Sequence, residues 1–206
     1  MSNRVMALFT LVFVTILGSS QALSQSRCNL TKDNSPSVRG LRLGMSTEQL
    51  LALFPGSAKR WAKDPKKIRE AREKAMAADS SEPVYLSFDL ATDAAKEQFA
   101  GVDSVSAGLY TGWVVDFSIV YVGGAWRTID EWVATVSETF KLPGAQDWVA
   151  GPSEHPNKVL RCNGIEIEAG IQGGSASIRI RNTEWLKAME ERTTAAEEKK
   201  RRDVKP

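Results

Sequence analysis

Few residues in the sequence have types and spacings that support catalysis or metal binding. The one histidine, His155, lies in a Pro-Ser-Glu-His-Pro stretch. It is a candidate general base or metal ligand, but no cysteine or second histidine stands beside it to complete a zinc site. We expect His155 to be an exposed loop residue.

A pair of carboxylates is the next candidate. Asp116 stands among apolar neighbours, and Glu166 lies in a later segment where apolar and polar residues alternate. Two carboxyl groups held together can divide the roles of general acid and general base. The sequence does not place these two side chains together, and alternation of this kind is typical of outward-facing strand positions. We favour the second interpretation.

Nucleophile and phosphate-loop motifs are absent from the sequence. The serines form no Gly-x-Ser-x-Gly elbow. Gly123-Gly124 and Gly173-Gly174 lack the strand-to-helix context of a phosphate loop, so we interpret both as turns. The sequence therefore predicts no catalytic, metal-binding or cofactor-binding residue, and a protein that is not an enzyme.

The most distinctive charged feature is the segment 59–74, with eight basic and three acidic residues. Asp64-Pro65 is typical of a helix start, and strong helix formers with few apolar positions follow. Such a helix is either a solvated surface helix or a contact for an anionic lipid, glycan or protein surface. The candidate contact residues are Lys59, Arg60, Lys63, Lys66, Lys67, Arg69 and Arg72.

Six tryptophans are many for this length. Trp132 falls on an apolar helical stripe and Trp113 on a core-facing strand position. Trp61, Trp126 and Trp148 lie at the ends of predicted elements. Because aromatic side chains are enriched at binding hot spots, these three are candidate partner contacts, with packing at the core or its rim as the alternative.

The overall composition is that of an ordinary globular protein, with 42% hydrophobic and 25% charged residues. The net charge of +2 gives no global electrostatic argument for nucleic-acid binding.

Residues 1–24 match a secretory signal peptide. One positive charge, Arg4, precedes an uncharged apolar run at 5–18, and a small polar stretch follows. We expect cleavage after Ser24, or as second choice after Ser26. The run is short for a membrane span, which needs about 20 apolar residues. We therefore expect a secreted or periplasmic protein that does not span the membrane after cleavage.

The chain has two cysteines, Cys28 and Cys162. Export would place them where disulfides form and persist, and only one pairing is available. We expect a Cys28–Cys162 bridge that ties the N-terminal arm to the C-terminal half. Two unrelated thiols are the alternative. Asn29-Leu30-Thr31 also matches an N-glycosylation acceptor, which matters only in a eukaryotic secretory pathway.

The first half of the predicted domain begins with a short capped helix. Ser46 and Gln49 match a capping box, and Phe54-Pro55-Gly56 ends the helix. Strands are expected at 84–90, 102–110 and 113–122. In the last of these, Trp113, Val115, Phe117, Ile119 and Tyr121 alternate onto one face.

The second half repeats this order. Thr128 and Glu131 match a capping box before an amphipathic helix that ends at Leu142-Pro143-Gly144. A loop is expected at 145–157, followed by strands at 158–162, 165–171 and 175–181. Asn163-Gly164 and Gly173-Gly174 are hairpin turns. We expect Glu166 or Glu168 to pair with Arg179 or Arg181 across the strands. A final helix is expected at 183–200, fraying after Glu190.

These elements predict an α+β fold of two repeats, each a helix followed by a three-stranded antiparallel meander, forming one helix-on-sheet domain with a C-terminal helix. The boundaries are 1–24 for the signal peptide, 25–38 for the arm, 39–182 for the domain, with halves 39–124 and 125–182, and 183–206 for the charged tail.

Gly44-Met45-Ser46, followed by Glu48, Leu50, Leu53 and Pro55, resembles the Gly-Met-Thr helix start of the BamE/SmpA-like envelope lipoprotein family. The order of elements is also similar to the tandem-repeat fold of β-lactamase-inhibitor proteins. The chain differs from the first family in lacking a lipidation site, and from both in its basic helix and charged tail.

The resemblance implies an exported binding or scaffolding module that contacts an unknown protein partner in the cell envelope or outside the cell. The alternative is binding of an anionic surface, polymer or small ligand through the segment 59–74.

Overall fold

The computed structural model describes residues 28–57, 83–94 and 97–203. The expected signal peptide and the basic segment 59–74, which includes Trp61, lie outside the described residues.

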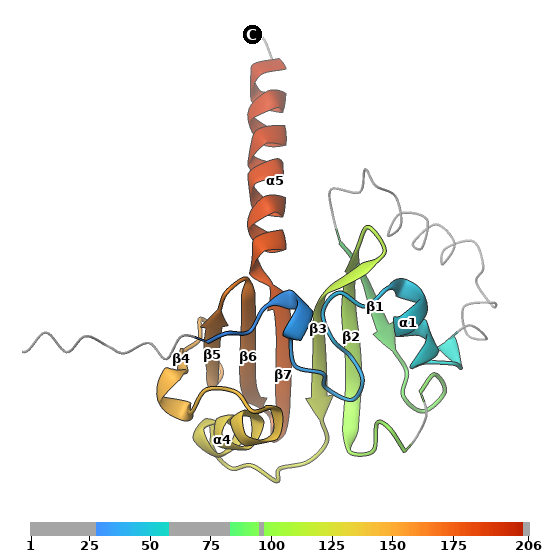
Figure 1. Cartoon of the computed structure of the whole chain (residues 1–206), viewed down its shortest axis with the longest axis vertical. Helices are drawn as coiled ribbons and strands as arrows, with labels where there is room; N and C mark the ends of the chain where they lie inside the picture. Colours follow the sequence, from blue (N-terminus) through green and yellow to red (C-terminus); the bar gives the residue numbers. More distant parts are fainter. Residues whose placement is uncertain (1–27, 58–82, 95–96, 204–206) are drawn as a thin grey trace, which may run out of the picture.

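The centre of the molecule is a seven-stranded antiparallel sheet with strand order β1-β2-β3-β7-β6-β5-β4 (Figure 1). The α+β class is confirmed, and β2 has the predicted bounds. The strands are β1 (Val84–Phe88), β2 (Val102–Tyr110), β3 (Trp113–Tyr121), β4 (Val149–Ala150), β5 (Asn157–Cys162), β6 (Ile165–Gln172) and β7 (Ser175–Asn182). Two consecutive meanders, β1-β2-β3 and β5-β6-β7, meet where β3 pairs with β7.

Three two-residue turns set the register within the meanders. The predicted turns Asn163-Gly164 and Gly173-Gly174 join β5 to β6 and β6 to β7. Thr111-Gly112 joins β2 to β3 with φ angles of 48° and 83°. In this turn and in Gly173-Gly174 both φ angles are positive, which matches the right-handed twist of the connected strands, whereas in Asn163-Gly164 only Gly164 has a positive φ angle.

Within the described residues, α1 (Thr47–Ala52), α4 (Ile129–Phe140) and α5 (Thr183–Asp203) begin where the sequence predicts. In α1, Ser46 and Gln49 form the expected capping box. In α4, the Thr128 hydroxyl accepts the Glu131 N–H at 3.2 Å, as expected. The Glu131 carboxylate, however, accepts the N–H of Arg127 rather than that of Thr128. The second half of the predicted capping box is therefore shifted by one residue.

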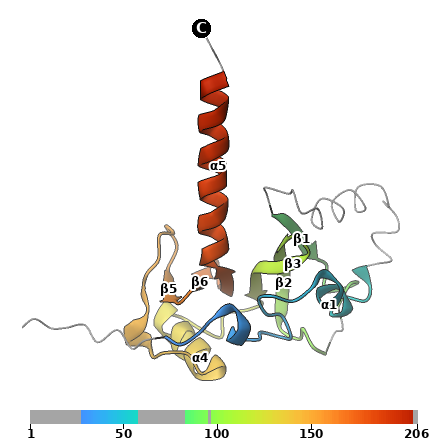
Figure 2. The ribbon, with the colours of Figure 1, turned by 45° about the horizontal axis from the view of Figure 1, so that its top comes forward.

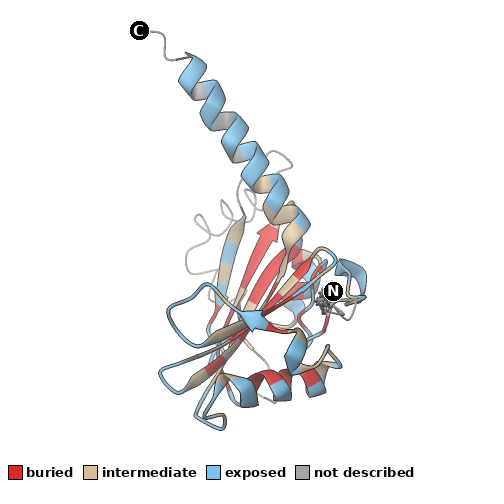
Figure 3. Cartoon of the chain, turned by 90° about the vertical axis from the view of Figure 1, so that its left-hand side faces the viewer, coloured by how far each residue is buried: buried red, intermediate tan, exposed pale blue. Residues whose placement is uncertain are grey.

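One face of the sheet is covered by α1, α4 and the arm at 28–45, which contains the 3-10 turn η1 (Lys32–Asn34) (Figures 1 and 2). Apolar side chains from all three pack against the strands. The covering residues include Val38, Leu41, Leu43, Leu50, Phe54, Trp132, Val133 and Val136. Figure 3 shows the buried side of α4 turned to the sheet.

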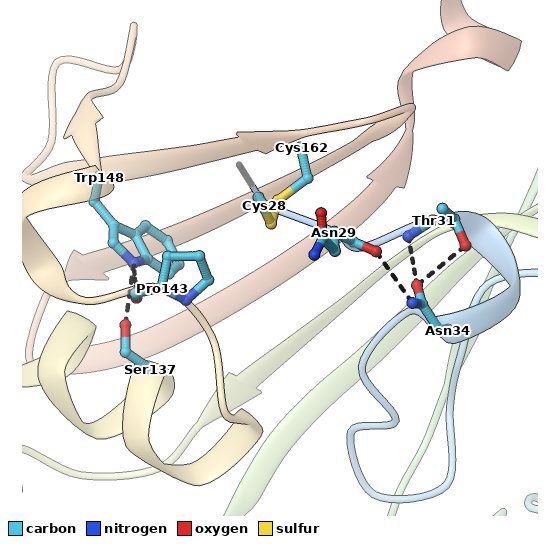
Figure 4. Close-up of a disulfide and its surroundings, with 8 residues drawn as sticks. All are labelled: Cys28, Asn29, Thr31, Asn34, Ser137, Pro143, Trp148 and Cys162. Atoms are coloured by element: carbon cyan, nitrogen blue, oxygen red, sulfur yellow. Dashed lines mark hydrogen bonds between the residues drawn. A yellow bond between two sulfur atoms is a disulfide. The ribbon is translucent and has the colours of Figure 1, made fainter. Parts of the chain in front are cut away.

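A disulfide joins Cys28 at the start of the arm to Cys162 at the end of β5, with a Cα–Cα distance of 5.1 Å (Figure 4). The predicted bridge is confirmed. It fixes the arm to one side of the sheet, and the arm then crosses the sheet to reach α1 (Figure 1).

A β-bulge in β3 overturns one expectation. Gly108 pairs with Asp116 but Leu109 pairs with Val114, so Val115 is an extra residue. Because a bulge inserts one extra residue, the side chains on one side of it point to the opposite faces from those that a regular strand would give. Val114 is therefore buried, and Trp113, expected to face the core, is 53% exposed.

Two expectations in the second half also need correction. The expected loop at 145–157 contains a 3-10 turn, η2 (Ala145–Asp147), and the short edge strand β4. The expected fraying after Glu190 is wrong, because α5 (Thr183–Asp203) continues as a helix of 21 residues that projects from the sheet, mostly exposed (Figure 3). Its later residues are strong helix formers, and Glu198 pairs with Arg202 one turn on.

A substitution at Gly56 tests the contact between the turn after α1 and the loop after β1. A Cβ added at Gly56 would lie 1.8 Å from the carbonyl oxygen of Thr92. We expect Gly56→Ala to lower the free energy of unfolding by about 1–3 kcal/mol, because the loop must move to relieve the overlap. The matched control is Gly124→Ala, where the nearest atom is 3.7 Å away. Equal denaturant midpoints for the two variants would contradict this packing.

Removing the disulfide should destabilise the chain strongly. The bridge spans 134 residues, and in the chain-entropy model a loop of this length contributes about 4–5 kcal/mol. We expect Cys28→Ala/Cys162→Ala to show a loss of this order in denaturant unfolding, and the unsubstituted chain to show it on reduction. A reduced chain as stable as the oxidised one would rule out this role.

Candidate functional site

The face of the sheet opposite the arm, α1 and α4 carries a continuous row of polar and charged residues. Their core-facing neighbours, such as Phe117, Ile167 and Ile180, are buried, and alternate side chains on a strand point to opposite faces. We call this surface the open face. Its first row, read across successive strands, is Tyr85, Gly108, Asp116, Arg181, Glu166 and Arg161.

A buried carboxylate lies at the centre of the open face. Asp116 on β3 is 2% exposed, and Arg179 on β7 binds both of its oxygens through Nε at 3.0 and 3.2 Å and also through Nη2. The hydroxyl of Tyr85 lies 3.4 Å from Oδ2 of the same carboxylate. A two-pronged pair of this kind fixes the orientation of both side chains.

These contacts shift the pKa values of the two partners of Asp116. The hydrogen bonds to Asp116 raise the pKa of Arg179 above its ordinary value, although burial acts in the opposite direction. Burial, and next the charge of Asp116, raise the pKa of Tyr85. Tyr85 therefore stays protonated as a hydrogen-bond donor, and Arg179 stays charged.

A second set of ion pairs continues along the row. Arg181 lies between Glu166 and Glu168, with N–O distances of 3.3 and 2.6 Å. Arg161 also binds Glu166 at 2.9 Å. The expected pairing of glutamates with arginines is thus confirmed for Arg181, while Arg179 binds Asp116 instead.

The structure does not bring Asp116 and Glu166 together as an acid–base pair. Arg181 lies between them in the register of the strands. Each carboxylate is bound by an arginine of its own. The outward-facing alternative is correct for both.

The open face has a hollow of about 280 Å³ beside Asp116. Its floor is made of small residues, and aromatic and charged side chains stand around it. The lining residues are Tyr85, Ser106, Gly108, Asp116, Phe117, Ser118 and Arg179. Tyr85 and Trp113 are both 53% exposed. The Tyr110–Trp113 pair is next to the Leu109–Val114 pair, whose side chains face the core. Because neighbouring residues on a strand point to opposite faces, Trp113 adds aromatic surface to the open face, as Tyr85 does.

A larger pocket of about 520 Å³ lies on the other side of the molecule. It is formed by α4, the end of β3, the arm near Arg39 and the residues before β2. Trp126, one of the predicted contact aromatics, lines it with Tyr121 and Trp132. The ring centroid of Trp126 lies 4.3 Å from that of Trp132 and 6.2 Å from that of Tyr121.

The other predicted residues lie apart from both places. Trp148 is 5% exposed, and its indole N–H contacts the Ser137 hydroxyl at 3.1 Å (Figure 4). It packs in the core, as the alternative interpretation had it. His155 is exposed, as expected, with its Nε2 2.8 Å from Nε2 of Gln172.

Trp61 and the basic residues Lys59, Arg60, Lys63, Lys66, Lys67, Arg69 and Arg72 remain predictions outside the described residues. Within the described ranges, no three metal-binding side chains gather, and no helix has the length and apolarity of a membrane span.

Sequence reasoning missed Tyr85, Arg39 and the Asp116–Arg179 pair. The two halves of that pair come from strands 63 residues apart in sequence. Only the pairing of β3 with β7 brings them together, and no local pattern in the sequence encodes that pairing.

Comparisons with known proteins add no identification, since no family model, curated protein or solved structure matches this chain significantly.

Because Asp116 is buried, we expect the loss of Arg179 to lower the free energy of unfolding more than the loss of another arginine of the open face. Arg179→Met should lower the free energy of unfolding by about 2–3 kcal/mol, because it leaves a buried carboxylate without its partner. Arg161→Met is the matched control. The Arg161 side chain is 60% exposed, so losing its ion pair should cost less than about 1 kcal/mol. Equal losses in denaturant unfolding would contradict a structural role for the buried pair.

Proposed function

We propose that this protein is an exported, non-enzymatic binding module whose open face docks a protein partner. The observation that carries the proposal is the open face itself, where exposed Tyr85 and Trp113 accompany a hollow with fixed walls. Tyrosine, tryptophan and arginine are the residues enriched at binding hot spots.

The electrostatics of the open face favour binding over acid–base chemistry. Asp116, Glu166 and Glu168 are each held by arginines. Fixing polar groups before association lowers the entropy lost on binding. The partner that fits is a polar protein surface that inserts one side chain into the hollow, since its volume of about 280 Å³ is below that of most small-molecule sites.

The fold-level resemblance supports the same function. We infer that residues 39–124 and 125–182 are two copies of one unit. In support, α1 precedes the meander β1-β2-β3, α4 precedes the meander β5-β6-β7, and the third strands of the two meanders are paired. Likeness to BamE/SmpA-like or β-lactamase-inhibitor-like proteins is an analogy of architecture, and it favours protein binding.

Export is part of the proposal. The signal-like segment 1–24 supports it, and so does the disulfide, because such bridges persist in oxidising compartments.

Site-specific photo-crosslinking tests the proposed function. A photoreactive amino acid replaces Ser106 in the hollow or, as the matched control, Glu138 on the solvent side of α4, and each purified full chain is illuminated in an extract of its native compartment. We expect one stoichiometric protein adduct from position 106 and none from position 138. Adding Tyr85→Ala or Trp113→Ala should abolish the adduct, because each removes an aromatic contact of the open face.

Other outcomes would reject the open face as the docking surface. These are the same adducts from both positions, no protein adduct from position 106, or an adduct that Tyr85→Ala and Trp113→Ala leave unchanged. Retention on anionic vesicles or glycan without a protein adduct would instead favour the alternative function through the segment 59–74.

A further inference from the structure

The pocket beside α4 has the size and lining of a small-ligand site. Its volume of about 520 Å³ falls within the roughly 300–1,000 Å³ of small-molecule pockets. The walls are predominantly apolar or aromatic, including Val38, Tyr121, Trp126, Trp132 and Phe140. It lies on the face of the sheet opposite the open face, so it is separate from the proposed docking surface.

Tyr121 and Trp126 are partly exposed and offer ring surface rather than polar groups to a ligand, whereas Trp132, 3% exposed, packs against both rings. The indole N–H of Trp126 is already donated to the Thr135 hydroxyl at 3.0 Å. That of Trp132 is donated to the carbonyl of Ser177 at 2.7 Å. The ring centroids of Tyr121 and Trp132 are 5.4 Å apart at an interplanar angle of 66°. Aromatic rings prefer to pack edge to face or offset, so a wall of tilted rings can accept one more aromatic ring from a ligand.

Arg39 places a positive charge at the pocket. Its backbone has φ of 55°, in the left-handed region that non-glycine residues rarely occupy without support. That support comes from the paired hydrogen bonds between Val38 and Leu41 and from Gln98, whose Nε2 donates to the Arg39 carbonyl at 2.8 Å.

The Arg39 guanidinium is held by neutral groups. Nη1 and Nη2 donate to the carbonyls of Gln98 and Ala100 at 3.4 and 3.1 Å, and Tyr121 lines the same pocket. Ion pairs between described residues involve Arg161, Arg179, Arg181, Arg202 and Lys158 but not Arg39. The positive charge of Arg39 therefore lies beside the aromatic walls, and no carboxylate among the described residues forms an ion pair with it.

We propose that this pocket binds a small aromatic carboxylate. The ring packs against the partly exposed Tyr121, Trp126 and Phe140, and the carboxylate accepts hydrogen bonds from Arg39. A guanidinium can bind a carboxylate with two parallel hydrogen bonds. Charge complementarity therefore selects an acid over a neutral or cationic compound of the same shape.

Calorimetric titration of the full chain with three matched probes tests the ligand class. The probes are phenylbutanoate, phenylbutanol and phenylbutylamine, which share ring and chain and differ in charge. We expect the acid to bind about fivefold more tightly than the alcohol, the order of effect of an exposed ion pair, and the amine to bind most weakly. No binding of the acid at millimolar concentration, or equal affinity for acid and alcohol, would overturn the proposal.

Two variants separate the charge from the cavity. Arg39→Gln should bring the acid down to the affinity of the alcohol and leave the alcohol unchanged. The matched control Arg42→Gln, on the same arm but outside the pocket lining, should keep the preference for the acid. A preference that survives Arg39→Gln, or that is lost equally in Arg42→Gln, would overturn the role of Arg39.

A third variant keeps the test decisive if Arg39→Gln fails to fold. Thr139 is an exposed lining residue, and Thr139→Trp should fill the pocket without touching the hydrogen bonds of Arg39. All three probes should then lose binding. Undiminished binding to Thr139→Trp would show that the probes bind elsewhere and would overturn the proposal.

Discussion

The pairing of β3 with β7 is the contact on which the rest of the structure depends. Six residue pairs, from Asp116–Arg181 to Tyr121–Ala176, join the two meanders into one sheet. A three-stranded meander with one short helix buries little apolar surface alone, whereas a seven-stranded sheet supports one continuous core. The same pairing sets Ile119 beside Ile178 in the core and brings Arg179 within reach of Asp116 on the open face.

The two faces of this sheet have different physical characters. One is covered by apolar side chains from the arm, α1 and α4, and the disulfide fixes the start of the arm beside β5. The other carries alternating carboxylates and arginines that neutralise one another. In the proposed function the polar face meets a protein, and the pocket beside α4 is a second, chemically different site.

Local patterns in the sequence predicted the elements well. The strand expected at 102–110 has the bounds of β2, Ser46 and Gln49 predicted the start of α1, and Asn163-Gly164 and Gly173-Gly174 predicted two turns. The bulge at Val115 was not predictable, because a single inserted residue leaves the alternation on each side intact. The same limit explains why Trp113 was assigned to the wrong face.

The candidate sites were predicted less well, because they arise from long-range contacts. Asp116 was noticed only as a carboxylate among apolar residues, and its partner Arg179 was assigned to a glutamate on the neighbouring strand. Arg39 was not predicted as a site residue, since its significance comes from a backbone turn and from carbonyls about 60 residues away in sequence. Of the predicted aromatics with described positions, Trp126 lines a pocket and Trp148 lies in the core.

Cross-strand nuclear Overhauser contacts between β3 and β7 test the central pairing most directly. The structure predicts contacts between Ile119 and Ile178 and between Ser118 and Arg179. Contacts shifted by one residue would place Arg179 toward the core, and contacts of β3 with a different strand would separate Arg179 from Asp116. The first result would contradict the open face, and the second would contradict both the order of strands in the sheet and the open face built upon it.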